Sequence, residues 1–435
     1  MLLKISLIFF SFFLLKLISS SYYPILIILI LGIITYLLAY FLERKKEDSK
    51  INYLFNNSVI IFFIIIIVLN ITGFVGTLTG SKNLDINDQD KIAMLFAAPF
   101  YLLSMGAYLT DISKKKIRAI NFVLFFLYIS YPFKLFAGPI ENTSLLAKLE
   151  KIKLTKSSYV LANCWSWIVL GLFMKFVISD RLTPSDMLSN TEATFSLISA
   201  FIFELKFYFD FAGYSFIAYG LSKAFGIKLT LNFKHPFLAP NVVQFWRRWH
   251  ISLGRFLSRY ILEAHIKKIK SHKFKLLFAS LIFMISAMWH GGTINYFYWG
   301  LFHGACYFIF ILFFKRKNIP HIVSYLIMVI FFILGRFFAI DLDATRLNEK
   351  IINLFILDSY TVPIDKFYVI AMTSSSELKA ILLGLIFILF EYFSIKIYGL
   401  NRPYHLFRKP IATVIITLFV ITFAVNNSEL LYARL

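Results

Sequence analysis

Cysteine and acidic residues are scarce in this 435-residue chain, which has two cysteines and 23 Asp and Glu against 45 Lys and Arg. Cys164 and Cys306 lie in apolar runs without metal-ligand spacing, so we interpret them as small buried residues. The chain also lacks a Walker loop, a Rossmann glycine fingerprint, a nucleophile elbow and an HExxH motif. We therefore expect no bound cofactor and no metal.

Apolar residues are abundant: 59% of the chain is hydrophobic and 19% is aromatic. Apolar runs of roughly 20 residues, the length that crosses a bilayer as a helix, recur along it. The alternating strands of an outer-membrane barrel are absent. The pattern predicts an all-α polytopic integral membrane protein with about eleven transmembrane helices. The candidate spans are 5–18, 22–42, 53–74, 92–112, 158–178, 194–222, 276–289, 294–313, 321–340, 377–398 and 410–425.

The formal net charge is +22, which in a soluble protein would suggest nucleic acid. Here the basic residues gather in short loops between the apolar runs, as the positive-inside rule expects, so we predict no nucleic-acid partner. The rule places the N-terminus in the cytoplasm, loop 113–118 and loop 399–409 inside, and loops 75–91 and 341–376 and the C-terminus outside, in the plasma or inner membrane. The basic clusters are Arg44-Lys45-Lys46, Lys114-Lys115-Lys116, Lys148 to Lys156, Lys267 to Lys275 and Lys315-Arg316-Lys317.

Two segments do not fit simple up-and-down helices. Residues 119–140 are apolar but are interrupted by Pro132, Gly138 and Pro139. Residues 230–262 contain two prolines, two tryptophans and four arginines, which is too polar for a lipid-facing span. Irregular backbone at membrane depth needs protein or a water-filled cavity around it. We predict two re-entrant elements that form a central funnel open to the cytoplasm, within a single domain over 1–435.

Two of the eight histidines stand out in this apolar chain, because ionisable groups at membrane depth usually serve a substrate path or a reaction. His250 ends the run Phe245-Trp246-Arg247-Arg248-Trp249-His250, and His290 lies in Trp289-His290-Gly291. A neutral imidazole suits a general base that takes a proton from an alcohol, although a buried histidine that bonds a carbonyl explains the pattern too. Arg247 and Arg248 beside indoles suit a phosphate group, but also an interfacial belt.

These motifs resemble the membrane-bound O-acyltransferases, specifically the bacterial branch with the alginate O-acetylation protein, the peptidoglycan O-acetyltransferases and the teichoic-acid D-alanyl transferase. The resemblance runs over about 92–305. The matching stretches are Tyr108-Leu-Thr-Asp111, Tyr131-Pro132, Ala137-Gly-Pro-Ile140, Gly171-Leu-Phe-Met-Lys175, Ser179-Asp-Arg181, Phe209-Asp210-Phe-Ala-Gly-Tyr-Ser215, Asn232-Phe233, Pro236-Phe237, Phe245 to His250 and Trp289-His-Gly291.

The resemblance implies that His290 is the catalytic base and that His250 lines the same tunnel. We expect Arg247, Arg248, Trp246, Trp249, Asn232, Asp210 and Trp289 to contribute to substrate binding. The sequence departs from the family after His250, where an aromatic-Arg-Asp-Tyr run is here Leu257-Ser258-Arg259-Tyr260. Because that Asp is missing, the sequence does not show which group pairs with or orients Arg259.

The hypothesis is therefore transfer of an acyl group, acetyl first, from a cytoplasmic thioester such as acetyl-CoA to a hydroxyl of an exported envelope polysaccharide. The acceptor would be reached directly or through an extracytoplasmic transferase partner. The alternative within the family is D-alanyl transfer from a carrier protein to a teichoic-acid-type polymer. The alternative of another class is a glycan or lipid transporter, which would not need His290.

Overall fold

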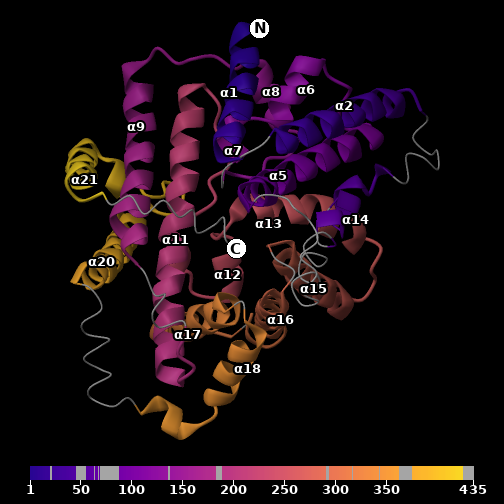
Figure 1. The fold of residues 1–435 in the computed structure, drawn as a ribbon. Helices are drawn as coiled ribbons and strands as arrows, with labels where there is room; N and C mark the ends of the chain where they lie inside the picture. The colour runs from indigo at the N-terminus through magenta and orange to yellow at the C-terminus, as the bar shows by residue number, and fades with distance from the viewer. Residues whose placement is uncertain are drawn as a thin grey trace. The chain divides into compact units, whose positions relative to one another are not determined.

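The computed structural model describes residues 1–19, 22–45, 55–62, 64–66, 68, 88–135, 138–182, 189–290, 293–315, 317–341, 343–361 and 375–424. In these residues all regular structure is helical and no strand is formed (Figure 1). Helices are what long apolar runs must form in lipid, because each helix pairs its own backbone N–H and C=O groups. The predicted all-α class is confirmed for this part of the chain.

The described elements follow in this order along the chain. They are α1 (Leu2–Ile18), α2 (Tyr23–Glu43), α5 (Asp88–Ser113), α6 (Phe122–Ile129), α7 (Pro132–Leu135), α8 (Leu145–Glu150), α9 (Ser158–Leu172), η1 (Phe173–Ile178), η2 (Ser179–Arg181), α11 (Ala193–Ala224), η3 (Pro236–Leu238), α12 (Val242–Trp246), α13 (Ile251–Leu257), η4 (Ser258–Leu262), α14 (Glu263–Ile266), α15 (His272–His290), α16 (Ile294–Ile309), η5 (Phe310–Phe314), α17 (His321–Ile340), α18 (Ala344–Asn353), η6 (Leu357–Tyr360), α20 (Ser375–Tyr398), η7 (Leu406–Arg408) and α21 (Pro410–Phe423).

Six helices in the described residues are long and apolar enough to cross a membrane: Pro24–Glu43, Ser158–Arg181, His272–His290, Ile294–Phe314, His321–Ile340 and Glu377–Tyr398. The predicted count of eleven is not confirmed. The run 410–425 gives α21, whose 14 residues are shorter than a straight crossing needs. The run 194–222 lies within the 32 residues of α11, which carry charged side chains along their length. Most of the run 53–74 lies outside the described residues.

Both interrupted segments lack a helix of spanning length. In the first, α6 ends at Ile129 and α7 starts at Pro132, which cannot continue a helix from the residues before it. In the second, η3 and α12 are five residues or fewer, and the chain is then helical without a gap from Ile251 to Ile266, which is still shorter than a bilayer crossing. The predicted breaks are confirmed, while the re-entrant path and the funnel stay predictions.

The chain divides into two compact units. Unit 1 comprises Met1–Trp165, Ala218–Leu231 and Ser252–Lys268, and unit 2 comprises Ser166–Ile217, Asn232–Ile251 and Ile269–Leu435. The single domain over 1–435 stays a prediction.

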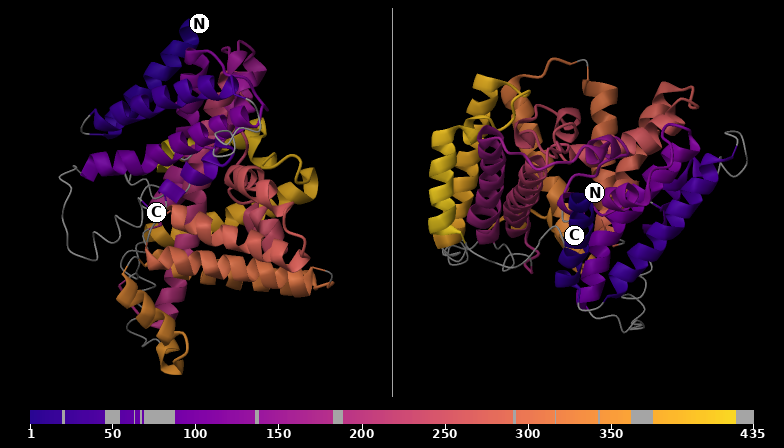
Figure 2. Two further views of the ribbon diagram at one scale, coloured as in Figure 1. Left: turned by 90° about the vertical axis from the view of Figure 1, so that its right-hand side faces the viewer. Right: turned by 90° about the horizontal axis from the view of Figure 1, so that it is seen from above.

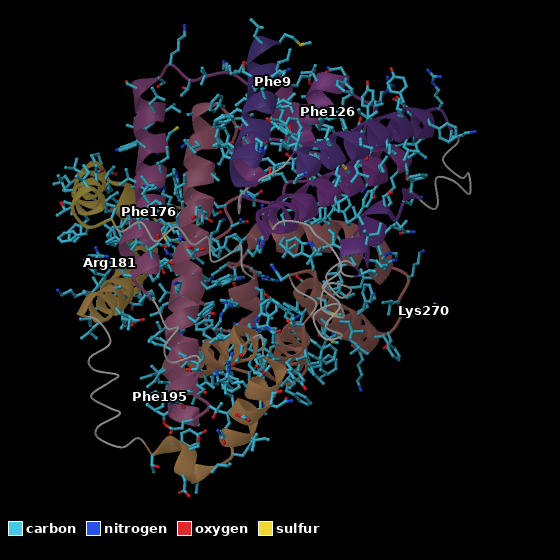
Figure 3. The ribbon with its side chains drawn as sticks, viewed as in Figure 1. Phe9, Phe126, Phe176, Arg181, Phe195 and Lys270 are labelled. Atoms are coloured by element: carbon cyan, nitrogen blue, oxygen red, sulfur yellow. The ribbon has the colours of Figure 1, made fainter. Side chains whose placement is uncertain are left out.

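Two of the predicted cytoplasmic basic loops meet within unit 1. Lys115, at the turn after α5, donates from Nζ to the carbonyl oxygens of Leu42 (3.2 Å) and Glu43 (2.9 Å) at the end of α2. A cation at a helix C-terminus satisfies its free carbonyls and the negative end of its dipole. The cluster after α2 and the cluster after α5 therefore lie at the same end of unit 1. Lys46 and Arg316 of the predicted clusters lie outside the described residues, whereas Lys270, between α14 and α15, is exposed (Figure 3).

In unit 2, α15, α16 and α17 pack as neighbours, with α15 and α16 side by side (Figure 2). Small residues allow this approach. A Cβ on Gly300 of α16 would lie 2.7 Å from the Cα of Met284 and 2.8 Å from the Cβ of Ala287, both on α15. Close backbone approach through glycine is typical of helix pairs in membranes. It holds the end of α15, which carries His290, against α16.

Candidate functional site

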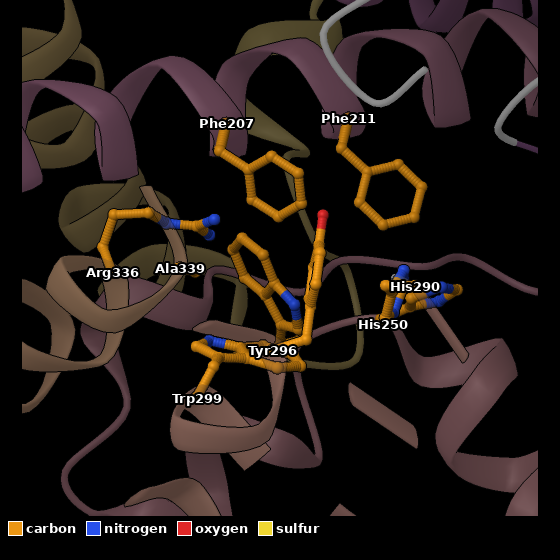
Figure 4. Close-up of a pocket in the computed structure, with 9 residues that line it drawn as sticks. Phe207, Phe211, His250, His290, Tyr296, Trp299, Arg336 and Ala339 are labelled. Atoms are coloured by element: carbon orange, nitrogen blue, oxygen red, sulfur yellow. The ribbon is translucent and has the colours of Figure 1, made fainter. Parts of the chain in front are cut away.

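A small pocket in unit 2 contains both predicted histidines (Figure 4). Its cavity volume is about 30 Å³, enough for one or two waters. Four stretches of chain build it: α11, the segment after α12, the α15–α16 corner and α17. The residues that line it are Phe207, Phe211, Trp249, His250, His290, Tyr296, Trp299, Arg336 and Ala339.

His290 is the last residue of α15. Its ring lies edge-on to Trp289, with centroids 4.6 Å apart, and edge-on to Trp299 of α16 at 6.0 Å. The next two residues, Gly291 and Gly292, lie outside the described residues. The His290 side chain lines the pocket together with Tyr296 and Trp299 of α16.

His250 is held by an unusual backbone. Its φ is +40°, in the left-handed region that costs a non-glycine residue roughly 1–2 kcal/mol. Two backbone hydrogen bonds hold the segment: Ile251 N donates to Asn232 O and Lys234 N to Arg248 O, both over 3.0 Å. The ring is 5% exposed and stands edge-on to Phe211 at 4.8 Å. Such strained positions cluster at functional sites.

Aromatic rings make up most of the pocket wall. Trp249 stacks on Phe245 at 5.4 Å and on Phe207 at 5.8 Å. Offset stacking of this kind adds about 0.5–1.5 kcal/mol per pair beyond the buried area. The wall is therefore largely apolar, and a low-dielectric surrounding strengthens any electrostatic interaction inside it.

Arg336 is the charged member among the lining residues that the structure describes. It is 5% exposed, and its Nε donates to Glu204 Oε2 of α11 over 2.6 Å. Its guanidinium lies 4.1 Å from the centre of the Phe207 ring. Figure 4 places it on the opposite side of the pocket from His250 and His290. Sequence reasoning missed this residue, although a single arginine in the apolar run 321–340 was a usable signal.

The remaining predicted binding residues do not line this pocket. Trp289 contacts His290, and Trp246 contacts Trp299, Phe283 and His303, so both lie directly behind the wall. Asn232 is buried and supports the His250 segment through its backbone carbonyl.

Asp210 takes part in a buried ion-pair cluster. Lys175 Nζ lies 2.6 Å from Asp210 Oδ1 and 2.5 Å from Asp180 Oδ1, and all three side chains are at most 2% exposed. The cluster ties η1 and η2 to α11. This places Asp210 in a structural contact next to Phe211 rather than in the pocket, so we do not assign it to substrate.

The two arginines differ in surroundings. Arg248 is half-buried and its Nη1 donates to Leu238 O over 3.0 Å, which ties α12 to η3. Arg247, the residue after α12, is exposed. That these arginines hold a phosphate of the donor stays a prediction, and Arg247 fits it better because it is exposed.

In unit 1, Arg259 of the run Leu257-Ser258-Arg259-Tyr260 has a partner from elsewhere in the chain. Asp111 Oδ2 accepts from Arg259 Nη2 (3.0 Å), Tyr260 Oη (2.9 Å) and Thr143 Oγ1 (2.5 Å). The carboxylate that the local run lacks is thus supplied by α5. For the residues described, no three His, Cys, Asp or Glu side chains are grouped so that they could hold a metal ion.

The family profile of the membrane-bound O-acyltransferases matches residues 12–342 of this sequence. Among curated proteins, the chain is 33% identical over 197 residues to the peptidoglycan O-acetyltransferase of Helicobacter pylori, covering 42% of this chain and 36% of that protein. It is 30% identical over 210 residues to the teichoic acid D-alanyltransferase of Bacillus subtilis (44% and 52%). It is also 30% identical over 212 residues to a Pseudomonas fluorescens protein named "Probable alginate O-acetylase AlgI" (47% and 42%). The match spans about a third to a half of the length of these relatives.

Proposed function

The chain belongs to the membrane-bound O-acyltransferase family, and on this premise we propose that it moves an acetyl group from a cytoplasmic thioester, acetyl-CoA first, to a hydroxyl of an exported envelope polysaccharide. One observation carries the proposal: His290 and His250 line one cavity. The acceptor is reached directly or through an extracytoplasmic partner.

In this reaction His290 acts as general base. It takes the proton of the acceptor hydroxyl while the hydroxyl oxygen attacks the thioester carbonyl. The C–S bond then breaks, the leaving thiolate takes up the proton, and the products are an ester and a free thiol. General-base catalysis contributes about 10²- to 10⁴-fold, and positioning supplies much of the rest. His250, fixed by its strained turn and Phe211, orients the reacting groups.

One feature of the pocket favours acetyl over D-alanyl. A D-alanyl ester carries an ammonium group, which pairs best with a carboxylate. The described residues that line this pocket include no carboxylate, and Glu204, behind the lining residue Arg336, is already paired with it.

Six candidate spans and the family assignment make this a multi-pass membrane protein. For its orientation we propose the N-terminus in the cytoplasm and the C-terminus outside. The shared end of the α2 and α5 basic clusters supports that assignment. Most of the predicted outer loop 75–91 lies outside the described residues, as do all of the C-terminal residues 425–435.

The test compares His290→Ala with His303→Gln, a buried histidine on α16 that does not line the pocket. Cells that lack the native gene would carry each variant, and acetyl esters released from their envelope polysaccharides would be quantified. We expect His290→Ala to lower the ester content at least about 100-fold and His303→Gln to keep it, at equal protein level. Wild-type ester content in the His290→Ala strain would refute the proposal and favour the transporter.

A further inference from the structure

A second cavity lies wholly within unit 1, and none of the residues assigned to catalysis lines it. Its volume is about 570 Å³, and it is bounded by the loop from α5 to α6, the first turn of α6, the start of α8 and η4. The lining side chains are Lys116, Ile117, Arg118, Ala119, Ile120, Asn121, Leu124, Thr143, Ser144, Leu146, Ala147, Glu150 and Arg259. The proposed reaction does not use this space.

The cavity is positively charged. Lys116, Arg118 and Arg259 line it, and Glu150 is the acidic residue among the described lining residues. Asp111, which pairs with Arg259 and lies 4.0 Å from Lys116 Nζ, offsets a second charge, so one positive charge is left in excess. Asp111 lies fully buried behind it and already accepts from Thr143, Arg259 and Tyr260. Arg259 uses Nη2 on that carboxylate, so its position is fixed from behind. The buried acid therefore orders the arginine at the edge of the cavity.

The first turn of α6 adds to this potential. Ala119, Ile120, Asn121 and Leu124 line the cavity, so the N-terminal end of the helix lies beside it. Asn121 caps the helix by accepting from Leu124 N over 2.9 Å. The N-terminus of a helix carries a partial positive charge and favours anions, phosphate groups in particular.

The cavity also offers apolar surface, since Ile117, Ile120, Leu124 and Leu146 line it, and α6 continues as an apolar helix. Basic pockets beside membrane helices on the cytoplasmic side are typical sites for anionic lipid head groups. We propose that this cavity binds the phosphate diester of an anionic phospholipid, with Lys116, Arg118 and Arg259 at the phosphate and the apolar lining side chains against the acyl chains. The proposal does not depend on the acyltransferase reaction.

The test uses the purified full-length chain in phosphatidylcholine nanodiscs with increasing phosphatidylglycerol, and native mass spectrometry to count the phosphatidylglycerol that is retained. The variant Lys116→Gln/Arg118→Gln removes two of the three charges and leaves Arg259, which holds Asp111. The matched control is Lys151→Gln/Lys156→Gln, two exposed lysines that do not line the cavity. Thermal unfolding in pure phosphatidylcholine checks that each variant is folded.

We expect the cavity variant to bind phosphatidylglycerol roughly 30-fold more weakly than wild type, because two basic side chains near an anionic lipid are lost. The control should bind within about 3-fold of wild type, and 10-fold excess inorganic phosphate should not displace the lipid. Equal weakening in the control would overturn the proposal in favour of general surface charge. Displacement by inorganic phosphate would overturn it in favour of a soluble phosphate ligand.

Discussion

Replacing either Arg336 or Glu204 alone should lower the free energy of unfolding far more than replacing both residues together, because the two form a buried ion pair. Arg336 Nε and Glu204 Oε2 are 2.6 Å apart, and their side chains are 5% and 9% exposed. Removing one partner of a buried pair leaves the other charge without compensation, which typically costs about 3–5 kcal/mol. Replacing both removes the penalty along with the attraction.

The magnitudes follow from these contacts. We expect Glu204→Gln to lower the free energy of unfolding by about 3–5 kcal/mol. Arg336→Gln should cost at least as much, because the guanidinium also loses its cation–π contact with Phe207 at 4.1 Å, worth about 2 kcal/mol when desolvated. The double variant should lie within about 2 kcal/mol of wild type, since two glutamines can still hydrogen-bond. The coupling energy between the two sites is then at least about 4 kcal/mol.

The assay is unfolding of the purified protein in mixed micelles, titrated with a denaturing detergent and followed by circular dichroism. Lys273→Gln on the exposed first turn of α15 serves as control and should change stability by less than about 0.5 kcal/mol. Additive single-variant losses would refute the reasoning, because they would mean that the pair does not form.

Three further predictions concern packing, pH and orientation. Gly300→Ala should cost about 1–3 kcal/mol and reduce activity, because the new Cβ would lie 2.7 Å from the Met284 backbone and push α15 and His290 away; unchanged melting and activity would contradict this packing. Burial raises the pKa of the Asp341 carboxyl, but hydrogen bonds from Arg346 and Lys350 outweigh it, so the folded-state pKa lies below the ordinary value. The stability that Asp341 contributes is therefore fully present above the unfolded pKa of about 4 and is lost as pH falls through the lower folded pKa. Wild type and Asp341→Asn should converge in melting temperature below about pH 4 and diverge above it. A constant difference in melting temperature would argue against the shift. With Cys164 and Cys306 replaced by serine, an impermeant thiol reagent on intact cells should label Asp343→Cys and spare Lys115→Cys, and the reverse pattern would invert the proposed orientation.

Much of the local structure was predictable because it depends on neighbouring residues. Apolar runs near 20 residues predicted helices such as α15 and α17, and Pro132 predicted the break after α6. The two histidine motifs were visible in the same way, as rare ionisable residues in apolar surroundings. The number of spans was less predictable, because a short run such as 410–425 reads as apolar without being long enough to cross.

The composition of the pocket depended on tertiary structure. Which face of α11 and α17 meets the histidines is decided by side-chain packing between segments far apart in the chain, and hydropathy does not encode that rotation. This packing brings Phe207, Tyr296 and Arg336 to the cavity, while Asp210 on the same helix as Phe207 turns to Lys175. It likewise brings Asp111 of α5 to Arg259, 148 positions later, in place of the missing local acid. A charge in a low-dielectric interior must find a partner wherever the fold offers one, and only the folded chain determines which partner that is.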